Sequence, residues 1–180
     1  MSYDRSLPWC AYVRVVVHFA CLVGAVCSAA GAWSAEIAVS DAVPLTAGFA
    51  ESDITPSLGM EAPGGYGKSY HSTVHDACKI RAAVFGDGAR RVAIVGVDAI
   101  GVHGEMVRDA REQIQQRCGI LPQCVLVAAS HSHSSGPLCG VFPGSYDHAP
   151  ELVRKLAYDQ STCTNKEYYD DVLKKLVDAV

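Results

Sequence analysis

The sequence predicts an α/β domain built on a mixed sheet that contains a β-hairpin and a right-handed βαβ unit. Two apolar runs separated by a glycine-bearing loop, residues 79–85 and 91–99, predict the hairpin. Apolar residues at helical spacing over 104–118 then separate the second run from a third run at 124–129. This strand–helix–strand order is typical of parallel strands joined by a right-handed crossover.

The first element is a short strand over residues 45–55, where LTAGFAESDIT alternates between apolar and polar positions. Residues 56–67, PSLGMEAPGGYG, are rich in proline and glycine and predict a loop that approaches another part of the molecule closely. The helix over 104–118 carries Met106, Val107, Ala110 and Ile114 near a 3.6-residue period, and Gly119 supplies its stop signal. The short apolar run at 124–129 is of the kind found in strands that are covered on both faces.

A final helix is expected over residues 166–180. One face of it collects the apolar residues Val172, Leu173, Leu176, Val177 and Val180, and no cap signal follows. Such a face needs a partner surface, which we expect in sequence that is not present here. The sequence therefore predicts a fragment of a larger domain.

Length and charge narrow the class of protein. A chain of 180 residues fits one domain of ordinary size. The formal net charge is −4, the isoelectric point is near 5.9, and the lysines and arginines are scattered. No basic stripe is present, so nucleic acid is not expected as a partner.

The N-terminus has the pattern of a secretory signal peptide over residues 1–34. Arg5 and Arg14 precede the apolar run VVVHFACLVGAVCSAAGA, and small residues follow it. An uncleaved membrane anchor is the alternative, because the run is just long enough to span a bilayer. Cleavage would leave residues 35–180 as a secreted, periplasmic or cell-surface protein. Thiols oxidise readily outside the cytoplasm, so Cys118 with Cys124 and Cys139 with Cys163 are hypothetical disulfide pairs.

The stretch ASHSHSSGP places His131 and His133 just past the carboxyl end of a parallel strand, where open α/β sheets bind ligands. Histidines two residues apart on extended backbone point to opposite sides, so a shared site requires a turn here. Neutral imidazole binds zinc through one nitrogen, and Asp98 could accept a hydrogen bond from the other. A catalytic zinc usually has three protein ligands, and this motif supplies at most two. Other candidate ligands in the chain are His71, His75, His103, His148, Asp76, Asp147 and Glu105.

Two other hydrolase chemistries fit less well. The serines of the turn do not lie in a G-x-S-x-G elbow, which makes a serine triad a weak hypothesis. Ser135 and Gly136 stand where a di-zinc HxHxDH motif would have Asp and His. A plain polar loop with two solvated histidines remains the alternative to a site.

From Leu45 to Pro137 the chain resembles the neutral/alkaline non-lysosomal ceramidase family. The matching features are AGFAESDITP, GGYG, KIRAAVF followed by RVAIVGVDAIGV, and VLVAASHSHSSGP. The hallmark of the family is an HTHSGP-like turn, which appears here as HSHSSGP with one extra serine. The resemblance implies that residues 35–180 are the N-terminal segment of a ceramidase-like catalytic domain.

The resemblance also implies a function and roles for residues. His131 would be a ligand of a catalytic Zn²⁺, and His133 would contact the substrate or the developing oxyanion. Gly65, Tyr66 and Gly67 would belong to a substrate loop. The implied activity is that of an exported zinc-dependent amidohydrolase, acting on the amide bond of an N-acyl sphingoid lipid (ceramide) or a similar compound, with a membrane surface met through the substrate. The remaining zinc ligands are expected beyond Val180. The alternative is a non-catalytic exported α/β binding module with an incomplete metal site.

Overall fold

The computed structural model describes residues 44–180. The elements in chain order are β1 (Thr46–Asp53), β2 (Lys79–Gly86), β3 (Arg91–Val97), α2 (Gly104–Cys118), the short 3₁₀ helix η2 (Pro122–Cys124), β4 (Val125–Ala129), α3 (Glu151–Tyr158) and α4 (Lys166–Ala179). The signal peptide predicted for residues 1–34 lies outside the described residues.

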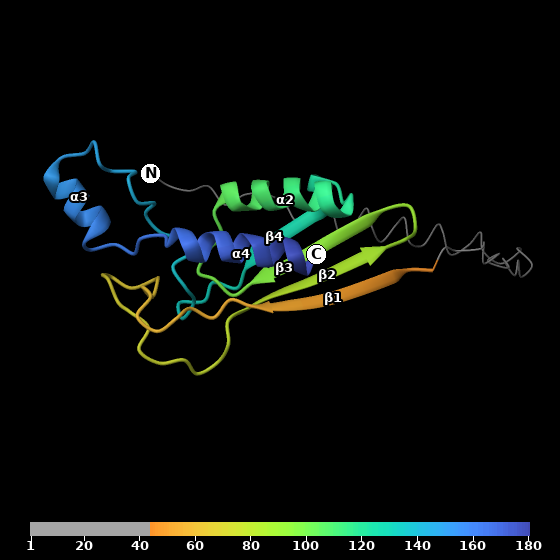
Figure 1. Ribbon diagram of the computed structural model, residues 1–180, viewed down its shortest axis with the longest axis horizontal. Helices are drawn as coiled ribbons and strands as arrows, with labels where there is room; N and C mark the ends of the chain where they lie inside the picture. Colours follow the sequence, from red (N-terminus) through yellow and green to blue (C-terminus); the bar gives the residue numbers. More distant parts are fainter. Residues whose placement is uncertain (1–43) are drawn as a thin grey trace, which may run out of the picture. The chain divides into compact units, whose positions relative to one another are not determined.

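The four strands form one mixed sheet in the order β1-β2-β3-β4 (Figure 1). β1 and β2 are antiparallel, as are β2 and β3, whereas β3 and β4 are parallel. The predicted hairpin and strand–helix–strand unit are therefore confirmed. β4 begins one residue later than expected, because the backbone N–H of Cys124 donates to the carbonyl of Leu121 and closes a 3₁₀ turn.

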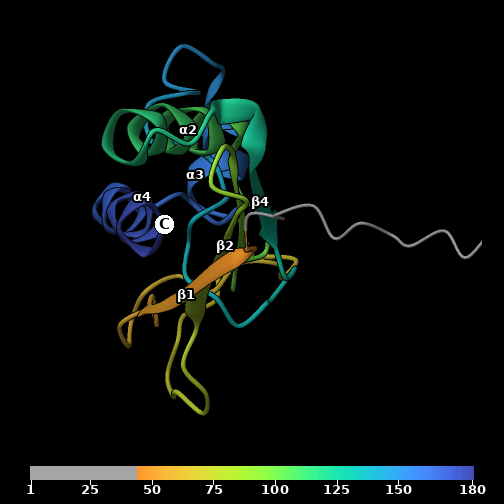
Figure 2. The same ribbon diagram turned by 90° about the vertical axis from the view of Figure 1, so that its right-hand side faces the viewer.

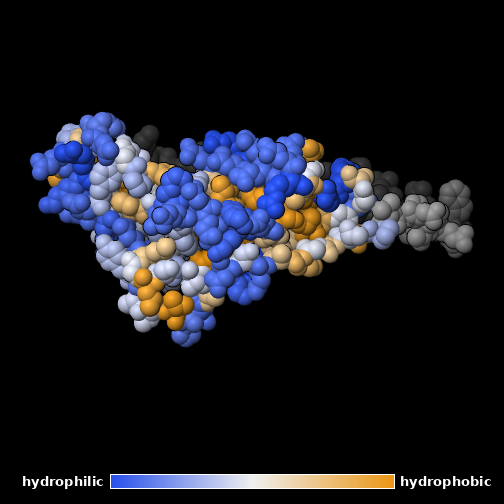
Figure 3. All heavy atoms as spheres, viewed as in Figure 1, coloured by the Kyte–Doolittle hydropathy of each residue, from blue (hydrophilic) through white to orange (hydrophobic). Residues whose placement is uncertain are grey.

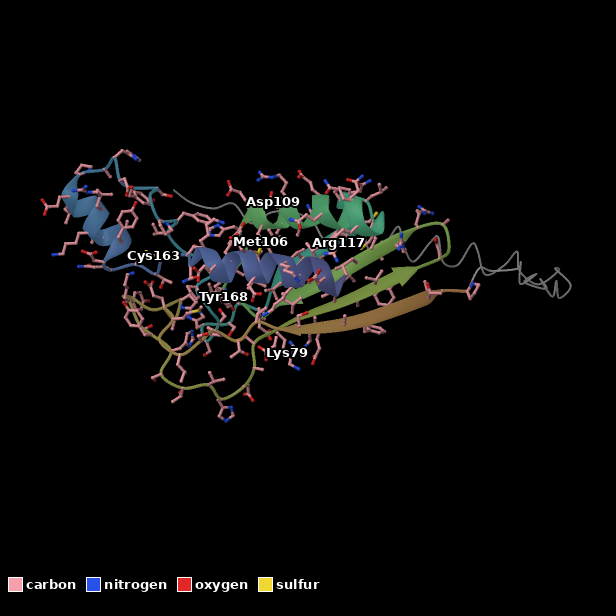
Figure 4. All side chains as sticks on the ribbon, viewed as in Figure 1. Lys79, Met106, Asp109, Arg117, Cys163 and Tyr168 are labelled. Carbon is pink, nitrogen blue, oxygen red and sulfur yellow. The ribbon has the colours of Figure 1, made fainter. Side chains whose placement is uncertain are left out.

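Helices α2 and α4 lie side by side on one face of the sheet (Figure 2). Between them and the strands lies the core, in which each of the following residues is at most 4% exposed: Ile80, Ala82, Ala93, Val95, Val97, Val125, Met106, Ala110, Ile114, Val172, Leu176 and Val177. The strand members alternate and the helix members recur at helical spacing, which are the periods read from the sequence. Figure 4 shows Met106 of α2 beside α4. The outward faces of both helices are hydrophilic (Figure 3).

The described residues cover β4 on one face of the sheet and leave its other face open, so the expectation that β4 is covered on both faces stays a prediction. In β4, Val125 is 2% exposed while its neighbour Leu126 is 54% exposed. Ile94 of β3 and Phe49 of β1 are likewise exposed. A continuous apolar run does not distinguish a strand buried on both faces from one with exposed apolar residues on its second face.

The last helix was expected to need a partner outside this sequence, and that expectation is wrong. The apolar face of α4 packs on the sheet and on α2 of the same chain, and Val172 and Leu176 are fully buried. Asn165 caps the start of α4 by accepting a hydrogen bond from the backbone N–H of Tyr168.

Helix α3 has no counterpart in the predicted elements. Of its apolar residues only Ala157 is buried, and Leu152 is 68% exposed. Its apolar residues do recur at helical spacing, but a run of eight residues is too short for that spacing to distinguish a helix from a loop or strand. No helix among residues 44–180 has the length and apolar character that crossing a membrane requires.

Neither hypothetical disulfide is formed, since all five cysteines of residues 44–180 are free thiols. Cys163 lies in the segment before α4 (Figure 4), where its Sγ is 3.7 Å from the Lys68 ammonium and its backbone N–H donates to Glu61. Lys68 and Glu61 form an ion pair of their own. This polar cluster joins the loop after β1 to the segment before α4.

Candidate functional site

The histidine turn begins where the ladder between β3 and β4 ends. The backbone N–H of Ser130 donates to the carbonyl of Val97, and that of Ser132 donates to Ala99, both at 3.0 Å. Between them His131 takes a left-handed backbone conformation, with φ at 62°. This conformation costs of order 1 kcal/mol in a residue other than glycine. It interrupts the alternation of the strand, and the rings of His131 and His133 lie with their centroids 5.1 Å apart and nearly perpendicular.

One hydrogen bond assigns the proton of the exposed His131 ring. Its Nδ1 lies 2.8 Å from the carbonyl oxygen of Ile100. A carbonyl oxygen only accepts, so Nδ1 carries a hydrogen, and in the neutral ring Nε2 then keeps its lone pair. This is the arrangement in which a histidine binds a metal through Nε2 while a backbone carbonyl holds the other nitrogen.

Asp98 does not take this role, although it lies at the end of β3 as expected. Its carboxylate accepts hydrogen bonds from the backbone N–H of Lys79 at 2.9 Å and from the Arg81 guanidinium at 3.0 Å. Partial burial alone would raise the pKa of the Asp98 carboxyl, but these two hydrogen bonds and one from Ser130 lower it below its ordinary value. Asp98 is therefore an ionised carboxylate that holds β2 against β3, and the Ile100 carbonyl is the partner of His131.

His133 lines a cavity of about 570 Å³ between the turn and the loop that precedes β2. The other lining residues include His71, His75, Asp76, Cys78 and Asp98, and His131 is not among them. Burial raises the pKa of the Cys78 thiol, so this wall of the cavity carries a protonated sulfur. The structure thus brings two of the other candidate histidines to the cavity of His133.

The glycine-rich loop reaches the site through Gly64, one residue before the predicted substrate-loop residues. Gly64 has φ of +89°, and a Cβ built on it would lie 2.8 Å from Cε1 of His133 and 2.7 Å from Cδ1 of Ile100. Gly65, Tyr66 and Gly67, together with Gly64, line a separate hollow of about 430 Å³ with the end of α3. The feature of the sequence that could have identified Gly64 as a contact of His133 was its position as the first of two adjacent glycines.

Replacing Gly64 by alanine is expected to displace the ring of His133 and to lower the free energy of unfolding by about 1 to 2 kcal/mol, because the left-handed backbone and the lack of space both oppose a Cβ. Chemical-shift changes at His133, together with a urea unfolding curve, would measure both effects. Gly67→Ala is the matched control, since nothing lies within 4 Å of a Cβ built there. Unchanged His133 shifts in the Gly64 variant would contradict the contact.

The described residues do not complete a zinc site. No three His, Cys, Asp or Glu side chains of residues 44–180 gather where they could hold one ion. His75 is exposed beside Asp76, and His148 is exposed in a turn. His103 precedes α2, as expected, with its ring beside Phe142 and its buried Nε2 without a hydrogen-bond partner among the described residues. The free lone pair of His131 fits one zinc ligand, and the rest of a donor set is not assembled in this part of the chain.

No family model and no curated protein matches the sequence. Among solved structures, the fold is similar to a neutral ceramidase from Pseudomonas aeruginosa, with a TM-score of 0.55 and 18% identity over 76% of this chain. A second similar structure, a ceramidase complexed with C2, has a TM-score of 0.53 and 18% identity over 77% of this chain. The chain spans about a fifth of the length of these two proteins, 21% and 20%. The resemblance read from the sequence is confirmed for the fold.

Proposed function

We propose that this chain is a segment of a ceramidase-like hydrolase that cleaves the amide bond of an N-acyl sphingoid lipid or a similar N-acyl compound. The observation that carries the proposal is the histidine turn, in which His131 presents a free Nε2 beside His133, within a fold similar to part of neutral ceramidase. The proposal includes export, zinc dependence and a lipid substrate that is met at a membrane surface.

His131 serves as one zinc ligand in this proposal. The Ile100 carbonyl holds the Nδ1 hydrogen, so the ring cannot turn without losing that bond, and Nε2 stays directed away from Ile100. A bound zinc ion would lower the pKa of its water toward about 7 and polarise the amide carbonyl. The other ligands come from residues that the described part of the chain does not bring to His131.

His133 serves as the contact to the reacting amide. Its ring packs against Gly64 and lines the cavity, so an N–H of the imidazole can donate to the acyl carbonyl oxygen of a molecule bound there. Such a donor stabilises the transition state more than the ground state, because negative charge develops on that oxygen. A cavity of about 570 Å³ suits the head of a lipid amide.

Removal of metal tests the proposal directly. The protein, incubated with an N-acyl sphingosine and zinc, is expected to release the free amine, to lose this activity with a chelator and to regain it with added zinc. The released amine is measured by chromatography. Hydrolysis that resists chelation, with labelling by a serine-directed phosphonate, would instead favour a serine hydrolase. Zinc-loaded protein that releases no amine would favour the binding module and contradict the proposal.

A further inference from the structure

We infer that Ser135 is a positioning residue that sets the proton of His131 through the backbone of Ile100. Ser135 has no exposed surface, and it is one of only two buried polar residues in residues 44–180. Its hydroxyl donates to the carbonyl of Ser132 at 2.8 Å and accepts from the backbone N–H of Ile100 at 3.1 Å. The hydroxyl therefore closes the histidine turn and ties it to the segment after β3.

Ile100 links this hydroxyl to the imidazole. Its N–H is held by Ser135, and its carbonyl accepts the hydrogen from Nδ1 of His131. With both backbone groups of Ile100 hydrogen-bonded, the rotation of this residue is restricted and its carbonyl stays directed at His131, which favours the Nδ1–H tautomer of the ring. Without the serine hydroxyl, the partly buried N–H of Ile100 and carbonyl of Ser132 would lose their partners, and the two segments would separate to reach water.

Ser135 also reaches the loop that supports His133. Its carbonyl accepts a hydrogen bond from Nε2 of His71 at 2.9 Å, and the backbone N–H of His71 donates to Met60. The segment between Met60 and His71 contains Gly64, which packs against the His133 ring. Ser135 is thus hydrogen-bonded both to Ile100, which contacts His131, and to His71, at the end of the segment that packs against His133.

The neighbouring serine provides the matched comparison. Ser134 is exposed, and its hydroxyl makes no hydrogen bond to any other described residue, although its backbone takes part in the turn. The geometric inference stands without the proposed function. The role of this hydrogen bonding in catalysis, which is to keep the Nε2 lone pair of His131 available to a metal ion, rests on the proposed function.

The test is the tautomer of His131 in the full chain, measured by long-range ¹H–¹⁵N correlation of the ring at about pH 8, above the ordinary imidazole pKa of about 6.5. The unaltered protein and Ser134→Ala are expected to show the Nδ1–H form. In Ser135→Ala the fraction of this form should fall below about one half, because the Ile100 carbonyl is no longer held. An unchanged tautomer in a folded Ser135→Ala protein would overturn the inference.

A second measurement needs no variant. The Ile100 amide of the unaltered protein is expected to exchange its hydrogen more than about tenfold more slowly than an unprotected amide. Fast exchange at Ile100, or a His131 ring in the Nε2–H form, would overturn the inference even if Ser135→Ala does not fold. A correct tautomer without amide hydrolysis would leave the positioning intact and count against the proposed function alone.

Discussion

Under the proposed amide hydrolysis, His131→Ala is expected to lower kcat/KM by more than about 100-fold. Removing an outer partner of a metal-binding histidine already costs about 10- to 100-fold, and this change removes the ligand itself. His133 cannot replace it, because its ring lies 5.1 Å away and is turned by 81°. The fold should persist, since His131 is exposed and gives up one hydrogen bond worth about 1 kcal/mol.

His148→Ala is the control for this experiment, because His148 is an exposed imidazole in the turn before α3. It should hydrolyse the amide at the rate of the unaltered protein. Both variants are assayed for released sphingoid amine and for bound zinc, and near-identical circular dichroism would show that both are folded. Equal activity in the His131 variant and the unaltered protein would remove His131 from the mechanism. An equal loss in both variants would show that the effect is not specific to the turn.

Gly136→Ala is expected to lower the free energy of unfolding by roughly 3 kcal/mol. A Cβ built on Gly136 would lie 2.6 Å from Cε1 and 2.7 Å from the hydroxyl oxygen of Tyr168. Tyr168, in the first turn of α4 (Figure 4), is 6% exposed, and its hydroxyl donates to the carbonyl of Ile54 at 2.6 Å. Burial raises the pKa of this hydroxyl, so the donor stays protonated. The added methyl group combines overpacking of about 1 to 3 kcal/mol with loss of a hydrogen bond worth about 1 kcal/mol.

Urea unfolding of the Gly136 variant checks this value, again with Gly67→Ala as the control. The control should change the free energy of unfolding by less than about 0.5 kcal/mol. Adding Tyr168→Leu to Gly136→Ala should make the two changes non-additive, because the residues are in contact. Additive effects would mean that Gly136 and Tyr168 do not share the space that the structure gives them.

Local sequence signals were sufficient for most of the fold. The alternation of residues in β2 and β3 reflects their one buried face. The helical period of α2 follows from backbone geometry, and so does its end at Gly119, which adopts the left-handed conformation with φ of 69°. The helix α3 escaped prediction because it is only eight residues long, and coverage of the second face of β4 could not be read because β4 is apolar on both sides. Coverage of a strand face depends on residues distant in the sequence, so a local apolar run does not reveal it.

The position of the candidate site could also be read from the sequence, because two imidazoles after an apolar strand lie where sheets bind ligands. The hydrogen-bond and packing partners of those imidazoles could not be read from the sequence. His131 bonds to a backbone carbonyl, His133 packs against a glycine, and one of four serines in the turn is buried. Backbone carbonyls are chemically alike at every position, so only the packing of distant segments decides which one faces a side chain. The sequence by itself determined the strands, the main helices and the histidine turn, and the tertiary structure alone decided the partners that hold the turn.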